Sequence, residues 1–163
     1  MSNSAPCLLD SAPETTASPK PAPGNLTYSL GLPAGPYCVP STRAHVRRLL
    51  HEHGLGDLAD LATLAASELL ANAYLFTPGS DVSLSLRWRF SVLRVTVFDE
   101  HPRHPKALRD SCRARRQDGL AMLDAVVGAC GGLCGLDEVG APLSGSKAWV
   151  VIPREAAEAY ARL

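Results

Sequence analysis

The chain has 163 residues, of which 46% are apolar, and its 16 basic residues are balanced by 16 acidic ones. This length and apolar content are typical of one compact domain and exclude a wholly disordered or fibrous chain. A formal net charge of zero excludes the global basic field that general nucleic-acid binding needs. The sequence has no apolar run near the roughly 18 residues of a membrane span and no export signal. We therefore expect a cytoplasmic protein with neither nucleic acid nor membrane as a direct partner.

The beginning of the chain is rich in proline, serine and alanine. Eight of the 13 prolines fall in the first 40 residues, and proline fits neither a helix interior nor a central strand. We predict a disordered tail over residues 1–24 and one folded domain over residues 25–163. The alternation of apolar and polar residues over 25–32 predicts an edge strand at the start of that domain.

Two helices are expected next. Ser41 or Thr42 is placed to cap a helix that ends near Gly54. Asp57 is placed to cap a second helix, with Asp60 three residues later as in a capping box. This second helix should stop before the Pro-Gly pair at 78–79.

The second half of the chain alternates between predicted strands and helices. Residues 82–89 and 93–99 predict a hairpin whose last residue, Asp99, faces the same side as the core. Residues 101–117 have weak periodicity and predict a long, arginine-rich loop that could act as a lid. A helix over 120–127, strands over 133–139 and 147–152, and a helix over 155–162 complete the chain. The order predicts an α+β fold, a two-layer α/β sandwich with a mostly antiparallel sheet and helices on one face.

Two polar residues stand out on the second predicted helix. Glu68 and Asn72 lie one turn apart at the edge of an apolar stripe, and the opposite face carries Asp60, Thr63, Ser67 and Tyr74. Burying a carboxylate and an amide without partners costs several kcal/mol, so these groups are expected to line a cavity or meet a ligand, a metal-bound one included. The alternatives are a solvated glutamate and an asparagine bonded within the core.

The cysteines admit a second kind of site. A zinc site can be built from Cys130 and Cys134 with Cys112 and two histidines, His101 and His104. Their spacing matches no usual zinc pattern, which favours reduced thiols that fill the core.

Four segments together resemble the Bergerat ATP-binding domain shared by gyrase, heat-shock chaperone, histidine-kinase and mismatch-repair ATPases. They are residues 67–73 (SELLANA), 95–99 (VTVFD), 118–123 (DGLAML) and 145–149 (GSKAW), within a match over residues 25–153. More narrowly, the chain resembles the bacterial anti-sigma-factor serine/threonine kinases. The resemblance implies Mg²⁺ and ATP as cofactors, and a sigma factor or an anti-anti-sigma-type protein as partner. The oligomeric state is left open, a homodimer included.

The resemblance also implies roles for individual residues. Asn72 would bind ATP through Mg²⁺, an ion that prefers oxygen ligands, and Glu68 would be the catalytic base for a partner's serine hydroxyl. Asp99 would accept a hydrogen bond from the adenine amino group, supported by Ser146. Gly119, followed by Leu120, would open a helix whose amide groups approach phosphate. The alternatives without a role in nucleotide binding are that Asp99 begins a turn, that Gly119 is an ordinary helix entry, and that the arginines of the lid are solvated.

Three departures from the family pattern keep a second function open. The family often has a basic residue or histidine shortly after the asparagine, where this chain has Tyr-Leu-Phe at 74–76. The glycines expected after the adenine-binding aspartate are replaced by Glu-His-Pro-Arg-His-Pro at 100–105, and a further expected glycine is Gln117. The first hypothesis is therefore an ATP-dependent kinase, and the second a degenerate nucleotide- or protein-binding module that acts by stoichiometric sequestration. A third and weaker hypothesis is a fragment of a sensor kinase that acts on histidine.

Overall fold

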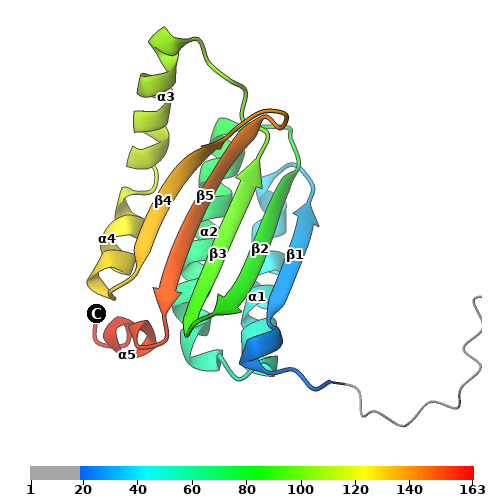
Figure 1. Ribbon diagram of the computed structural model, residues 1–163, viewed down its shortest axis with the longest axis vertical. Helices are drawn as coiled ribbons and strands as arrows, with labels where there is room; N and C mark the ends of the chain where they lie inside the picture. The colour runs from blue at the N-terminus through cyan, green and yellow to red at the C-terminus, as the bar shows by residue number, and fades with distance from the viewer. Residues whose placement is uncertain (1–18) are drawn as a thin grey trace, which may run out of the picture.

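The sheet and the helices form two layers, as Figure 1 shows for the computed structural model, which describes residues 19–163. The five strands pair antiparallel throughout, in the order β1-β2-β3-β5-β4. The predicted α+β class and two-layer sandwich are confirmed. Residues 1–18, most of the predicted tail, lie outside the described residues. Within 19–163, no helix has both the length and the apolar character needed to cross a bilayer.

The strands alternate between a face that packs on the helices and a more exposed face. Their bounds are β1 Thr27–Leu32, β2 Val82–Arg89, β3 Val92–Asp99, β4 Leu133–Val139 and β5 Gly145–Pro153. Leu84, Val95 and Val150 of the three central strands are fully buried, as the period-2 pattern predicts. The predicted hairpin of β2 and β3 is present, and the first strand lies at the sheet edge as expected.

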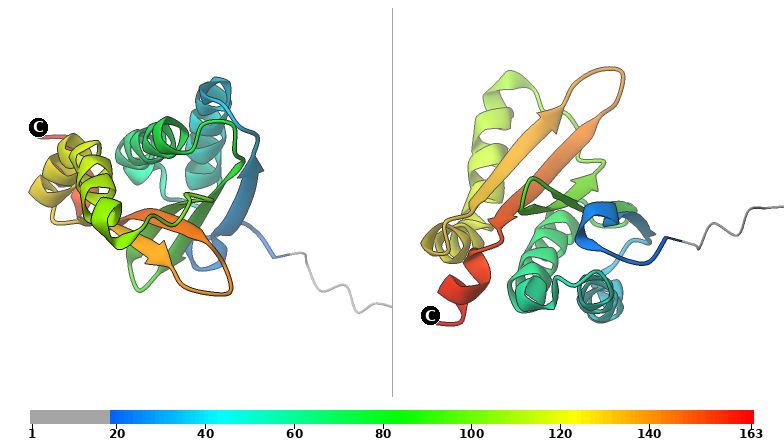
Figure 2. Two further views of the ribbon diagram at one scale, coloured as in Figure 1. Left: turned by 90° about the horizontal axis from the view of Figure 1, so that it is seen from above. Right: turned by 60° about the horizontal axis from the view of Figure 1, so that its bottom comes forward.

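Helix α2, Ala59–Phe76, is the centre of the helical layer. It is flanked by α1 (Val39–Glu52) and α4 (Ala121–Ala129), and the short helix α5 (Ala156–Tyr160) contacts α4. Figure 2 shows the helices gathered on one side of the sheet. Because α2 has neighbours on several sides, Thr63 and Tyr74 are buried as well, although they lie on the face opposite the apolar stripe.

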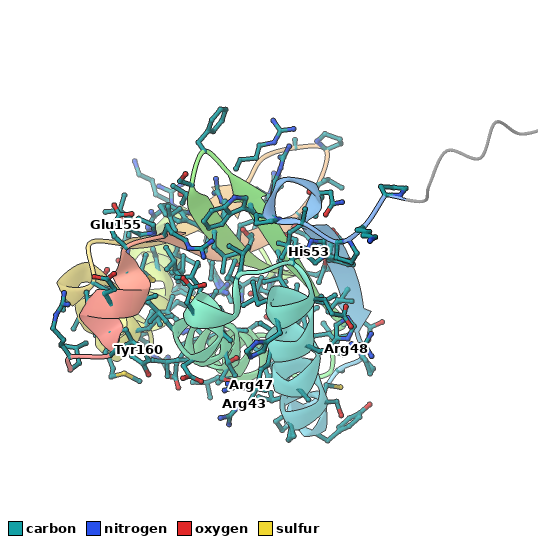
Figure 3. The ribbon with its side chains drawn as sticks, turned by 90° about the horizontal axis from the view of Figure 1, so that it is seen from below. Arg43, Arg47, Arg48, His53, Glu155 and Tyr160 are labelled. Atoms are coloured by element: carbon teal, nitrogen blue, oxygen red, sulfur yellow. The ribbon has the colours of Figure 1, made fainter. Side chains whose placement is uncertain are left out.

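The predicted helix starts are displaced. Helix α1 begins at Val39 with Pro40 in its first turn, where the missing N–H costs no helical bond, and the Thr42 hydroxyl donates to the Cys38 carbonyl instead of capping. A 3-10 turn, Gly56–Leu58, precedes α2, which has no side-chain cap. Asp57 instead pairs with Arg154 at 2.9 Å. Asp60 pairs at 2.7 Å with Arg47, labelled in Figure 3, and so joins α2 to α1.

The prediction of a long loop over 101–117 is wrong for most of that segment, because Lys106–Asp118 forms helix α3. Its residues are mostly good helix formers, but within this helix only Arg116 is buried. Because the helix is rich in arginine and its one buried side chain is charged, it lacks the apolar stripe by which a helix is usually predicted.

His53 connects the segment before β1 to the end of α1. The side chain is buried, its Nε2 lies 2.8 Å from the Tyr28 hydroxyl, and its Nδ1 lies 2.6 Å from the Ala22 carbonyl oxygen (Figure 3). A 3-10 turn, Pro23–Asn25, follows directly. The chain therefore contacts the domain from about residue 22 onward.

Candidate functional site

The candidate site lies where β3 ends and β5 begins, at the end of the sheet beside the β4–β5 connection (Figure 1). The antiparallel register places Asp99 directly opposite Ser146. Asp99 has no exposed surface and Ser146 is 3% exposed, so an ionisable carboxyl group sits at the edge of the apolar core. Such a group needs compensating charge or hydrogen bonds.

Arg116 supplies the compensating charge. Its Nη2 lies 2.5 Å from Oδ2 of Asp99 and its Nη1 lies 3.3 Å from Oδ1, which is a two-point pairing. The Ser146 hydroxyl donates to Oδ1 at 2.9 Å and accepts from Nη1 of Arg116 at 2.5 Å. The His101 backbone N–H adds a donor at 3.1 Å. Three of these four donors reach Oδ1 and one reaches Oδ2, and Asp99 has no exposed surface, so the carboxylate is enclosed by groups of the fold itself.

Arg116 reaches this position from the last turn of α3. The side chain is 2% exposed, and its guanidinium lies over the Phe76 ring at 5.6 Å from the centroid. Nε has no hydrogen-bond partner among the described residues. The guanidinium therefore holds Asp99 and Ser146 from inside the fold.

Asn72 lies next to the backbone of the same helix end. Its Nδ2 donates to the Arg116 carbonyl at 2.9 Å, whereas Oδ1, also buried, has no hydrogen-bond partner among the described residues. A Cβ at Gly119 would lie 2.6 Å from Nδ2 of Asn72. Gly119 is thus required for close packing, and it ends α3 rather than opening a helix; α4 begins after Leu120.

The remaining predicted residues lie apart from this group. Leu120 is buried in the core. Glu68 is half-buried and has no hydrogen bond or ion pair among residues 19–163. The structure thus joins Asp99, Ser146 and Asn72 through Arg116, and Glu68 keeps its role only as a prediction.

A cavity of about 390 Å³ opens beside the buried pair, between α3, the segment after β3 and the β4–β5 connection. Of the predicted residues, only Ser146 lines it. Four arginines line it as well: Arg103, Arg109, Arg113 and Arg116. Arg113 and Arg103 donate to the Leu136 and Leu143 carbonyls at 3.0 and 2.9 Å. Burial, and then the Arg116 charge, lower the pKa of His101, so its neutral imidazole is favoured.

Arg116 was not predicted as a functional residue, because the arginines of this segment were interpreted as a solvated surface. One feature of the sequence does indicate a buried cation at this position. An aspartate that ends a buried strand needs a cation or several donors, and the arginine-rich segment follows it directly in the chain. No pattern indicated which arginine turns inward.

Comparison with known proteins gives limited information. No family model matches the sequence, and no curated protein matches it. Among solved structures, the chain is similar to the catalytic domain of the histidine kinase ThkA in a nucleotide-free form. The TM-score is 0.49 at 13% sequence identity, and the alignment covers 78% of this chain and 97% of that one.

Proposed function

We propose that this chain is a regulatory binding module, similar in type to the anti-sigma-factor kinases, that acts by holding a protein partner stoichiometrically. The observation that supports this proposal is the buried pair of Arg116 and Asp99, which fills the position expected for adenine. A module that has closed its nucleotide pocket with its own side chain can still present a partner-binding surface. By the same resemblance, the partner is a sigma factor or an anti-anti-sigma-type protein.

The energetics favour the closed pocket. An adenine amino group would have to displace Arg116 from Asp99 and leave a buried guanidinium without its partner. Breaking a buried pair in this way costs about 3–5 kcal/mol, and 3 kcal/mol alone weakens binding more than about a hundredfold. ATP binding to the native chain is therefore expected to be weak unless α3 moves away from the sheet.

A second candidate function is an Mg²⁺-dependent ATP-binding serine/threonine kinase. The observation in its favour is Oδ1 of Asn72, a buried oxygen that has no partner within residues 19–163 and is of the type that Mg²⁺ prefers. Glu68, one turn earlier and without an ion pair among the described residues, has the chemistry of a general base. ATP, when bound, would supply the phosphoryl group. The Asn72 oxygen thus suits Mg²⁺ bound to the phosphates of ATP, whereas Arg116 fills the position expected for the adenine.

Nucleotide binding to three proteins separates the two functions. We would measure ATP affinity with and without Mg²⁺ for the native chain, Arg116→Ala and the exposed-arginine control Arg115→Ala. The proposal expects weak binding by the native chain and the control, and at least about a hundredfold tighter binding by Arg116→Ala. Tight binding by the native chain would contradict the closed pocket.

Phosphotransfer provides the second test. The native chain is incubated with ATP labelled on the γ-phosphate, Mg²⁺ and a candidate antagonist protein. The proposal expects a one-to-one complex with a partner and no transfer of label. Label transfer that is lost in Glu68→Ala would establish the kinase instead.

A further inference from the structure

Three side chains with metal-binding atoms converge beside the cavity, next to the buried pair. They come from two segments, His101 and His104 from the stretch after β3 and Cys112 from the middle of α3. His101 Nε2 lies 3.0 Å from His104 Nε2 and 3.2 Å from Cys112 Sγ, and all three atoms lie within 4.8 Å of one another. All three residues line the cavity and are partly buried.

A backbone carbonyl sets the direction of the His101 lone pair. Nδ1 of His101 lies 3.3 Å from the Phe76 carbonyl oxygen, which can only accept a hydrogen bond. Nδ1 therefore carries the proton, and Nε2 directs a lone pair toward the other two donor atoms. Histidines that bind metals usually have this arrangement, with the second ring nitrogen held by a carbonyl or carboxylate.

The geometry points to a zinc site formed by Nε2 of His101, Nε2 of His104 and the Cys112 thiolate, with a fourth coordination position open to the cavity. Tetrahedral zinc with Zn–N near 2.1 Å and Zn–S near 2.3 Å separates such donors by about 3.3–3.6 Å. The two separations from Nε2 of His101 need to widen by only a few tenths of an ångström, and the His104 and Cys112 donor atoms, within 4.8 Å of each other, need to reach the same range. Two imidazoles and a thiolate suit a borderline-soft ion such as Zn²⁺, whereas Mg²⁺ and Ca²⁺ prefer oxygen.

The surrounding charges are compatible with a cation. Of the four arginines that line the cavity, Arg116 is paired with Asp99 and Arg109 lies 3.6 Å from Asp110, while Arg103 and Arg113 donate to backbone carbonyls. The thiolate cancels one charge of the ion, and the cavity is also lined by the carboxylate residue Glu138. The three proposed ligand side chains are distinct from the side chains that hold Asp99. A test of the zinc site is therefore independent of a test of the proposed function.

Cobalt substitution tests the site with a spectroscopic readout. The full chain is stripped with a chelator and titrated with Co²⁺, which should give tetrahedral ligand-field bands and a sulfur-to-cobalt charge-transfer band at one equivalent. Cys112→Ser should lose the charge-transfer band, and His104→Ala should weaken Zn²⁺ affinity more than about a hundredfold, beyond the cost of losing an outer-shell partner. Cys134→Ser is the matched control, because that thiol is half-buried elsewhere in the fold. Titration of the native chain without these bands would overturn the proposal.

Thiol protection tests the same site without any substitution. The native chain is alkylated with and without Zn²⁺, and the modified cysteines are located by peptide mass spectrometry. Zn²⁺ should protect the Cys112 peptide and leave the slow labelling of Cys134 unchanged, since burial raises the pKa of the Cys134 thiol to about 11. Equal labelling of Cys112 with and without Zn²⁺ would show a hydrogen-bonded cluster only and would contradict the site.

Discussion

At the scale of single residues, one arginine determines what the candidate site can do. Asp99 and Ser146 are where the sequence predicts them, and the predicted partner of both is a nucleotide. Arg116 takes that place with a two-point pairing inside the fold. A buried ion pair of this kind contributes little net stability compared with an apolar pair, but losing one member leaves an isolated charge.

A double-mutant cycle measures this asymmetry. Asp99→Leu and Arg116→Met should each lower the free energy of unfolding by about 3–5 kcal/mol, because each leaves a buried charge unpaired. The combined variant should lose much less than the sum, since it buries no charge. Urea denaturation of the four proteins gives the coupling free energy, and additive losses would show that the pair is not a unit.

Gly119 offers a second residue-scale test, with a control inside the same chain. Gly119→Ala would place a methyl group 2.6 Å from Nδ2 of Asn72 and disturb its bond to Arg116. We expect a loss of about 1–3 kcal/mol of unfolding free energy. Gly128→Ala in α4 meets no atom within 4 Å and should gain roughly 0.5 kcal/mol. If both variants had the same stability, the close packing of Gly119 on Asn72 would be refuted.

At the scale of elements, patterns with a clear period could be predicted and the others could not. The strands β2 and β3 and the helix α4 have regular apolar spacing, and all three were predicted. Helix α3 buries one arginine and has no apolar stripe, so it was predicted as a loop although most of its residues are good helix formers. Arg116 and Cys112 both belong to this helix, so their positions in the fold could not be predicted either.

Helix α3 should also be the least protected long helix of the domain. It has one buried side chain in 13 residues, whereas α2 is buried on most sides. We expect backbone amides of residues 109–118 to exchange with deuterium much faster than those of 63–76, and faster still in Arg116→Met. Peptide-resolved hydrogen exchange measures this difference. Equal protection of the two helices would mean that contacts other than Arg116 hold α3 in place.

The β2–β3 turn carries a local strain that can be removed. Phe90 and Ser91 connect the two strands at φ angles of 52° and 60°, values that suit asparagine and glycine in a two-residue hairpin. The Phe90 side chain is 92% exposed and contributes little to the core. The pair of changes Phe90→Asn and Ser91→Gly should raise the unfolding free energy by about 1 kcal/mol, measured by urea denaturation. An unchanged or lower value would show that this turn carries no strain.

At the scale of the whole molecule, helix α3 contributes a residue to the closed pocket and another to the proposed zinc site. The helix carries Arg116 into the pocket at its C-terminal end, and it carries Cys112 to the two histidines that follow β3. Zinc at the cluster would hold α3 against the segment after β3, whereas adenine at Asp99 would require the end of α3 to move away. The two ligands should therefore oppose each other, and linkage makes that opposition reciprocal.

Adenosine is the suitable probe of this coupling, because it lacks the phosphates that would chelate zinc in solution. If both proposals hold, zinc-loaded protein should bind adenosine about 5- to 150-fold more weakly than metal-free protein, the usual range of allosteric coupling. By reciprocity, saturating adenosine should weaken zinc binding by the same factor. In Cys112→Ser, zinc should leave adenosine affinity unchanged. Calorimetric titrations in both orders measure the two factors, and adenosine binding to the native chain that ignores zinc would show that the pocket opens without moving the metal-binding part of α3.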